Sequence, residues 1–139
     1  MSVDPARFVF DSFAMLAFLE GEAGMARVKA ILKEAEKGRC RVFFSWINLG
    51  EVLYITEREQ GQSKVRETLA HIQSLPIHML EVTPQEVLDA AHIKATHRLS
   101  YADAFAVVAA RAQGATVLTG DLEFKTVESI INIEWLPQK

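Results

Sequence analysis

The sequence has 139 residues and a mass of 15.5 kDa, close to the usual size of one globular domain. Half of the residues are hydrophobic and 24% are charged, with seven glycines and four prolines, and this composition excludes a disordered or low-complexity chain. The 15 basic and 18 acidic residues give a net charge of −3, which excludes an overall positive field that would hold nucleic acid. We therefore predict a single domain over residues 1–139.

The number of cysteines and the length of the hydrophobic segments indicate the cellular compartment of the protein. The single cysteine, Cys40, cannot form an internal disulfide, and the four histidines do not show the spacing of a zinc site. The longest apolar stretch, residues 8–19, contains Asp11 and is short of the roughly 18 apolar residues of a membrane helix. We therefore expect a cytoplasmic protein that does not associate with membranes.

Short β-type segments alternate with longer helical segments along the chain, a pattern typical of an α/β domain with a mainly parallel sheet. Segments rich in Val, Ile and Phe predict five strands, at residues 7–11, 41–45, 77–82, 115–119 and 131–135. Thr83 to Glu86 has the spacing of a capping box, and Gly114 is typical of a helix end. The prediction is an α/β fold with a five-stranded, mainly parallel sheet.

Two acidic residues near the first two predicted strands lie in strongly apolar sequence, where an ionised carboxylate is costly to bury. Asp11 is the only charged residue of FVFDSFAMLAFL and follows the first strand, a ligand position in open α/β sheets. Asp also favours helix N-caps, so capping is an equal alternative for this residue alone. Glu51 is the only charged residue of WINLGEVLYI, and its alternative is an ion pair with Arg58 or Arg41.

Two further acids lie near the fourth predicted strand. Asp103 is part of LSYADAFAVVAARAQG, where Ser100 to Asp103 has the spacing of a capping box, so capping is the stronger interpretation for that residue alone. Asp121 follows the strand in TVLTGDLEF, where a Thr-Gly-Asp turn is an ordinary way to end a strand. Each acid by itself therefore has a plain structural explanation.

The four acids together indicate a metal site, because the carboxyl ends of parallel strands meet at one edge of a sheet. Asp11, Glu51 and Asp121 follow the first, second and fourth predicted strands, and Asp103 opens the helix that leads to the fourth. Two like charges 4 Å apart repel by about 4 kcal/mol at an effective dielectric constant of 20, so such a cluster requires cations. Oxygen ligands favour Mg²⁺ or Mn²⁺, and the chemistry that uses this arrangement is phosphoryl transfer.

The ordered set of motifs resembles the PIN domain nucleases and, within them, the VapC toxins of prokaryotic toxin–antitoxin pairs. In chain order the motifs are Asp11-Ser12, Ser45 through Asn48 to Glu51-Val52, LSYADAF, TGDLEF and Ile133 to Leu136. They extend over nearly the whole chain. The resemblance implies a PIN-like three-layer α/β/α fold and an Mg²⁺- or Mn²⁺-dependent endoribonuclease that hydrolyses RNA phosphodiesters with a metal-activated water.

The resemblance also assigns roles to individual positions. It assigns catalysis and metal binding to the acidic quartet of Asp11, Glu51, Asp103 and Asp121. It implies supporting roles for three polar residues, Ser12, Asn48 and Thr119. The chain departs from the family pattern at Phe13, where a smaller residue is more usual, and at Glu123, where the loop varies. The resemblance further implies a homodimer and a cognate VapB-type antitoxin that blocks the groove.

Two other classes of function share part of this pattern. A phosphatase of the haloacid dehalogenase type also has an Asp after its first strand, but it requires a second acid two residues later, where this chain has Phe13. A non-catalytic PIN-fold module that binds other proteins is the main alternative, although such a module would be expected to lose at least one of the four acids. His97 and Arg98 are candidates for contact with phosphate because they lie close to Asp103 in sequence.

Overall fold

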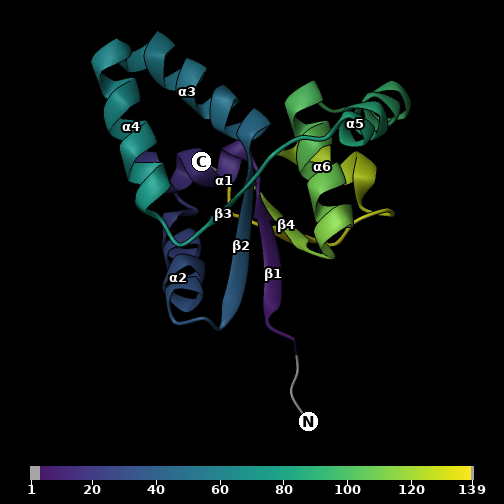
Figure 1. The fold of residues 1–139 in the computed structure, drawn as a ribbon, viewed down its shortest axis with the longest axis horizontal. Helices are drawn as coiled ribbons and strands as arrows, with labels where there is room; N and C mark the ends of the chain where they lie inside the picture. The colour runs from purple at the N-terminus through teal and green to yellow at the C-terminus, as the bar shows by residue number, and fades with distance from the viewer. Residues whose placement is uncertain (1–3, 139) are drawn as a thin grey trace.

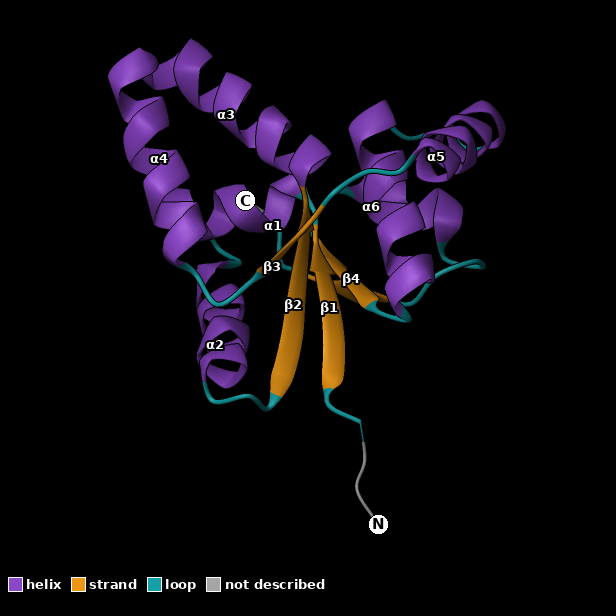
Figure 2. Ribbon diagram, in the orientation of Figure 1, coloured by secondary structure: helices purple, strands orange, loops and turns teal. Residues whose placement is uncertain are grey.

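The computed structural model describes residues 4–138, so residues 1–3 and 139 of the predicted domain lie outside the described part (Figures 1 and 2). The strands are β1 (Ala6–Phe10), β2 (Cys40–Ser45), β3 (His78–Leu80), β4 (Thr116–Thr119) and β5 (Ile133–Trp135). The α-helices are α1 (Ser12–Glu20), α2 (Met25–Glu36), α3 (Trp46–Gln60), α4 (Gln62–Ser74), α5 (Pro84–Thr96) and α6 (Tyr101–Gln113). A 3₁₀ helix, η1 (Leu122–Val127), follows β4.

The five strands form one sheet in the order β3-β2-β1-β4-β5, and every neighbouring pair is parallel. The predicted five-stranded sheet is therefore confirmed, and it is entirely rather than mainly parallel. After β1 the chain builds the sheet outward through β2 and β3, and it then crosses to the other side of β1 to add β4 and β5. The boundary between β1 and β4 is thus the switch point of the topology, and ligand crevices form at such points.

Helices cover both faces of the sheet, with α1 to α4 on one side and α5 and α6 on the other (Figure 1). Successive strand residues point to opposite faces, so each inner strand contributes to two cores. The core beneath α1 to α4 includes Phe10, Phe44 and Leu118. The core beneath α5 and α6 includes the preceding residue of each strand, namely Val9, Phe43 and Val117. This arrangement confirms the predicted three-layer α/β/α fold.

The helix ends form where the local sequence predicts them. The hydroxyl of Thr83 accepts a hydrogen bond from the N–H of Glu86 at 3.2 Å, and the carboxylate of Glu86 accepts one from the N–H of Thr83 at 3.3 Å. Gly114 ends α6 in the left-handed conformation, with φ of 59°. Within residues 4–138, the helices are too short or too polar to cross a lipid bilayer.

Candidate active site

Asp11 lies at the centre of the site, where β1 ends and α1 begins, and it is fully buried. One carboxylate oxygen, Oδ1, accepts a hydrogen bond from the N–H of Ala14 at 2.8 Å and caps α1. The other, Oδ2, accepts a hydrogen bond from the hydroxyl of Thr119 at the end of β4. Asp11 therefore caps α1 and also lies at the switch point between β1 and β4, so the two interpretations of this residue are compatible.

Asp103 lies in the first turn of α6, and 5% of its surface is exposed. Its backbone N–H donates a hydrogen bond of 3.1 Å to the side-chain oxygen of Ser100, the N-cap residue of α6. The capping interpretation is thus confirmed for the Asp103 backbone and the Ser100 side chain. The carboxylate of Asp103 extends to the other acids of the quartet.

Burial and mutual repulsion shift the ionisation of the two buried acids. The pKa of Asp11 is raised to about 7, and burial is the largest cause. The hydrogen bonds from Thr119 and Ala14 oppose this rise, and the charges of Asp121 and Glu51 contribute to it. Burial also raises the pKa of Asp103, and the charges of Asp11, Asp121 and Glu51 add to that rise. The structure therefore brings the four predicted acids within electrostatic interaction of one another.

Asp121 and Glu123 supply carboxylates from the start of η1. The Asp121 carboxylate accepts a hydrogen bond of 2.9 Å from the N–H of Glu123, and the Asp121 N–H donates one of 3.0 Å to the Thr119 hydroxyl. One carboxylate oxygen each from Asp103, Asp121 and Glu123 lie within 4.8 Å of one another. The family resemblance predicts only a variable loop at Glu123 and no role for its carboxylate. Its Asp-x-Glu spacing after a strand was the signal that could have singled it out.

Glu51 is half-buried on α3, one turn after Asn48. Within the described part of the chain it forms no ion pair, so the alternative of a partner at Arg41 or Arg58 is wrong. The guanidinium of Arg58 lies instead over the ring of Tyr54, 5.1 Å from its centroid. Among residues 4–138, therefore, no basic side chain pairs with the carboxylate of Glu51.

The amide of Asn48 joins three helix beginnings around the acids. Its Nδ2 donates hydrogen bonds to the Ser12 hydroxyl at 3.4 Å and to the Ala102 carbonyl at 3.2 Å. The Ser12 hydroxyl donates in turn to the backbone carbonyl of Asn48 at 3.3 Å. Ser12, Asn48 and Thr119, the three polar residues singled out from sequence, are all buried. They therefore hold the first turns of α1, α3 and α6 and the end of β4 together.

The residues present fit a hard divalent cation. The carbonyl oxygen of the Asn48 side chain is buried and has no hydrogen-bond partner among residues 4–138, an arrangement that is costly unless a donor or cation occupies the space beside it. The surrounding side chains offer carboxylate and hydroxyl oxygens, the ligand type that Mg²⁺ and Mn²⁺ prefer. The pKa values of Asp11 and Asp103 are raised, as expected for clustered carboxylates whose negative charge no cation balances.

The basic residues considered from sequence have different environments. The ring of His97 lies at the end of α5, with Nδ1 2.9 Å from the Thr96 hydroxyl and 3.2 Å from the Ile93 carbonyl. His97 thus closes α5 through local hydrogen bonds. Arg98 is exposed and remains a candidate for phosphate contact.

The loop between β4 and η1 is fixed by close packing. A Cβ atom added at Gly120 would lie 2.3 Å from Cε1 of Phe13, so the ring of Phe13 occupies the space that a side chain at position 120 would require. The side-chain amide of Gln138 donates a hydrogen bond to the Gly120 carbonyl. The larger residue at position 13 is thus matched by glycine at position 120, next to Asp121.

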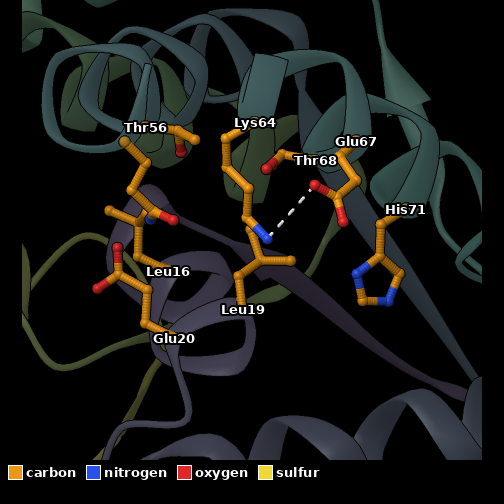
Figure 3. A pocket seen from close by; sticks show the side chains of 9 residues that line it. Leu16, Leu19, Glu20, Thr56, Lys64, Glu67, Thr68 and His71 are labelled. Carbon is orange, nitrogen blue, oxygen red and sulfur yellow. Dashed lines mark ion pairs between the residues drawn. The ribbon is translucent and has the colours of Figure 1, made fainter. Parts of the chain in front are cut away.

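A cavity of about 500 Å³ lies apart from the acids, between α1, α3 and α4 (Figure 3). Its wall combines apolar side chains, such as Leu16 and Leu19, with the Lys64–Glu67 ion pair of 3.7 Å. None of the four predicted acids is among the residues that line it. The acidic site and this cavity are therefore separate features.

Comparisons with known proteins agree with this architecture. A structure of VapBC2 from Rickettsia felis, bound to a DNA fragment from its promoter, contains a similar chain with a TM-score of 0.72 and 13% identity, covering 94% of this chain and 99% of that one. Mycobacterium tuberculosis VapC20, a sarcin–ricin loop cleaving toxin, has a TM-score of 0.73 and 20% identity, with coverage of 94% and 99%. DNA-bound VapBC from Salmonella typhimurium has a TM-score of 0.71 and 18% identity, with coverage of 93% and 97%.

These structures share the fold at low sequence identity. No curated protein matches the sequence significantly. The sequence profile described as the PIN domain matches residues 8–130. This range includes most of β1, all of β2, β3 and β4, and the four predicted acids, and it ends before β5. The chain therefore belongs to the PIN domain family.

Proposed function

We propose that this chain is a metal-dependent endoribonuclease. The observation that carries the proposal is the group of four acids at the switch point, where Asp11 and Asp103 are buried and their pKa values are raised by burial and by the other acids. A purely structural role gives no reason to bury two carboxylates beside two more. The oxygen-only donor set supports Mg²⁺ or Mn²⁺ as the cation.

In this proposal Asp11 and Asp103 hold the principal cation, Asp121 contributes directly or through water, and Glu51 completes the site. A cation held by these residues would supply activation of a water molecule and neutralisation of charge on the phosphate of the RNA backbone. Thr119 and the N–H of Ala14 orient the two oxygens of Asp11. Hydrogen bonds join the first turns of α1, α3 and α6, and the partial positive charge of helix N-termini favours a bound phosphate.

We further propose that the protein is a VapC-type toxin. The similarity to chains of VapBC structures over more than nine-tenths of the sequence supports this role. It leads us to expect a cytoplasmic homodimer and a VapB-type antitoxin as partner. The antitoxin would place a Lys or Arg among the carboxylates, since a cation is the group that the acids require.

Cleavage of single-stranded RNA by the purified protein tests the enzymatic proposal. We expect cleavage with Mg²⁺ or Mn²⁺, loss of cleavage in EDTA, and loss in Asp11→Asn and Asp103→Asn. Equal cleavage with excess chelator would overturn the mechanism. Expression without an antitoxin should slow growth, and the same two substitutions should relieve the effect.

Thermal melts distinguish a site role for Asp103 from a capping role without knowledge of the substrate. If Asp103 is mainly a cap, Asp103→Asn should lower the melting temperature equally with and without metal. If it belongs to the cation site, Asp103→Asn should leave stability in EDTA level or higher, because it removes repulsion among the acids. Mg²⁺ or Mn²⁺ should then stabilise the wild type more than the variant.

A second candidate function is protein binding without catalysis, and the cavity between α1, α3 and α4 is the observation that favours it. A module of this kind would bind a partner through residues such as Leu16, Lys64 and His71. Intact binding and biological effect in Asp103→Asn, together with a loss of both on substitution of Leu16, would favour this alternative.

A further inference from the structure

Residues 134–138, which we call the C-terminal segment, contact the beginning of α2. Arg27 of that helix donates two hydrogen bonds, of 2.6 and 2.9 Å, to the carboxylate of Glu134. Leu136 is buried, and a Cβ atom added at Gly24, directly before α2, would lie 3.2 Å from its Cδ1. The PIN domain profile ends at residue 130, so the C-terminal segment lies outside the part of the chain that the family match covers. One ion pair and one close packing contact therefore fix this segment to α2.

The C-terminal segment also contacts the turn that carries Asp121. The N–H of Leu136 donates a hydrogen bond of 2.8 Å to the carbonyl of Thr119. The side-chain amide of Gln138 donates a hydrogen bond to the carbonyl of Gly120. The N–H of Asp121 donates one of 3.0 Å to the Thr119 hydroxyl. Hydrogen bonds thus fix the backbone at residues 119, 120 and 121, and the C-terminal segment supplies two of these bonds.

The carbonyl of Gly120 accepts its hydrogen bond from Gln138 in a buried part of the turn. Loss of this donor would leave a buried carbonyl unpaired, which is costly. The ring of Phe13 closes one side of Gly120, where an added Cβ atom would lie 2.3 Å from Cε1. Without Gln138, the turn would have to move to bring its carbonyl to water. Such a movement would displace Asp121, the next residue.

Pro137 determines the direction in which Gln138 leaves the buried core. A proline ring fixes φ at about −65° and favours an extended conformation in the residue before it. Leu136 is buried and directly precedes Pro137, while Pro137 and Gln138 are exposed. The backbone therefore has little freedom between the buried Leu136 and the Gln138 amide. This restriction lowers the entropy cost of holding the hydrogen bond to Gly120.

We propose that Gln138 is a positioning residue for the cation site and that it acts through the carbonyl of Gly120. The inference rests on the proposed metal-dependent function, and it adds a residue that acts through the backbone of the turn rather than as a ligand. One carboxylate oxygen each from Asp103, Asp121 and Glu123 lie within 4.8 Å of one another, and the turn held by Gln138 keeps Asp121 at this distance. If the turn populates other conformations, the apparent affinity for a cation falls with the fraction of protein in the competent one.

Titration calorimetry with Mn²⁺ measures the contribution of the Gln138 amide. Gln138→Met keeps the approximate length of the side chain without the N–H donor, and Gln138→Ala removes both. Each should weaken Mn²⁺ binding by roughly 2- to 12-fold, the range that corresponds to one ordinary hydrogen bond. Gln85→Ala is the matched control, because the Gln85 amide donates a hydrogen bond of 2.9 Å to Asp89 within α5. This variant should bind Mn²⁺ as the wild type does.

A double-mutant cycle with Asp121→Asn tests whether Gln138 acts through Asp121. In the Asp121→Asn background, Gln138→Met should change the affinity for Mn²⁺ by less than about 2-fold, because the side chain that the turn positions no longer carries a charge. A residue that contributes only to overall stability would instead lower the melting temperature in EDTA and leave the Mn²⁺ affinity of the folded protein unchanged in both backgrounds. That result would overturn the positioning role.

Amide hydrogen exchange in EDTA tests the effect on the turn without a metal. Gln138→Met should speed exchange at the N–H groups of Asp121 and Glu123 several-fold, since hydrogen bonds at the turn hold both groups. Exchange at the N–H of Glu86, which donates to the Thr83 hydroxyl at the start of α5, should not change. Unchanged exchange at Asp121 and Glu123 would contradict the claim that Gln138 holds the turn.

The outcomes separate this inference from the proposed function. If the wild type binds no Mn²⁺ and does not cleave RNA, the proposed function fails, and the inference fails with it even where Gln138 orders the turn. If the wild type binds Mn²⁺ and cleaves RNA while both Gln138 variants bind Mn²⁺ as tightly as the wild type, the inference fails and the ribonuclease stands. Weaker binding in both variants, unchanged binding in Gln85→Ala and a reduced effect in the Asp121→Asn background support the positioning role.

Discussion

The hydroxyl of Thr119 donates a hydrogen bond to Oδ2 of Asp11, and this contact crosses the boundary between β4 and β1 at the switch point of the sheet. The same Thr119 oxygen accepts a hydrogen bond from the N–H of Asp121. One hydroxyl therefore orients a fully buried carboxylate and fixes the backbone of a second acid. In the proposed cation site, this arrangement would make Thr119 a positioning residue.

We expect Thr119→Val to weaken metal binding at neutral pH. The hydrogen bond from Thr119 lowers the pKa of Asp11, so its loss raises that pKa and leaves less carboxylate to bind a cation. Hydrogen bonds to charged groups contribute about 1.5–3 kcal/mol, which corresponds to roughly 10- to 150-fold in affinity. Titration calorimetry with Mn²⁺ measures the change. Thr119→Ser keeps the hydroxyl and should bind nearly as the wild type, and equal affinity in Thr119→Val would contradict the positioning role.

The stability of the metal-free protein should fall as the pH rises from about 5 to 8. The pKa of Asp11 is about 7 in the folded protein and near 3.9 in an unfolded chain, so the folded state holds more protons between these values. The stabilisation is complete below pH 4 and is lost as the pH rises through 7. Thermal melts in EDTA at several pH values measure this dependence.

Mg²⁺ should reduce this loss of stability, because a cation stabilises the ionised carboxylates. Asp11→Asn is the matched control, and its melting temperature should depend less on pH over the same range. A wild-type melting temperature that rises from pH 5 to pH 8 in EDTA would show that Asp11 ionises at its ordinary pKa.

Gly120→Ala should destabilise the protein through the ring of Phe13. The added Cβ would lie 2.3 Å from Cε1 of that ring, and overpacking of this kind typically costs about 1–3 kcal/mol. In a Phe13→Ala background the space is free, so the same change should cost less than about 0.5 kcal/mol. Urea unfolding of the four proteins in this double-mutant cycle measures the coupling. If the free-energy costs of Gly120→Ala and Phe13→Ala are additive, a contact other than that with Phe13 explains why glycine is required at position 120.

Glu123→Gln should lower the affinity for Mn²⁺ less than Asp121→Asn does. The Glu123 carboxylate lies within 4.8 Å of those of Asp103 and Asp121 but is exposed, so water screens its charge. We expect a loss of affinity of several-fold, larger at low salt. Glu128→Gln is the control, because Glu128 is an exposed acid at the opposite end of η1. Equal effects of the two glutamine variants would exclude Glu123 from the site.

The sequence alone determined the local structure of this protein. The five strands, the capping box at Thr83 and the end of α6 at Gly114 depend on residue type and on spacing over a few positions, and all are present where they were predicted. The strand bounds differ by one or two residues, and β3 (His78–Leu80) and β5 (Ile133–Trp135) are shorter than the predicted ranges 77–82 and 131–135. The resemblance in the sequence also led to the family. The roles of Asp11, Glu51, Asp103 and Asp121 as metal ligands stay predictions, although the structure brings their charges together.

Only the tertiary structure decided which groups meet across the site. The strand order determines that Thr119 lies against Asp11, 108 positions earlier in the chain, and the packing of α3 on α6 determines that Asn48 reaches the Ala102 carbonyl. The proximity of Glu123 to Asp103 depends on the path of the loop after β4, which the Gly120–Phe13 contact constrains. Such contacts follow from how whole elements pack, and spacing along the chain carries no information about them.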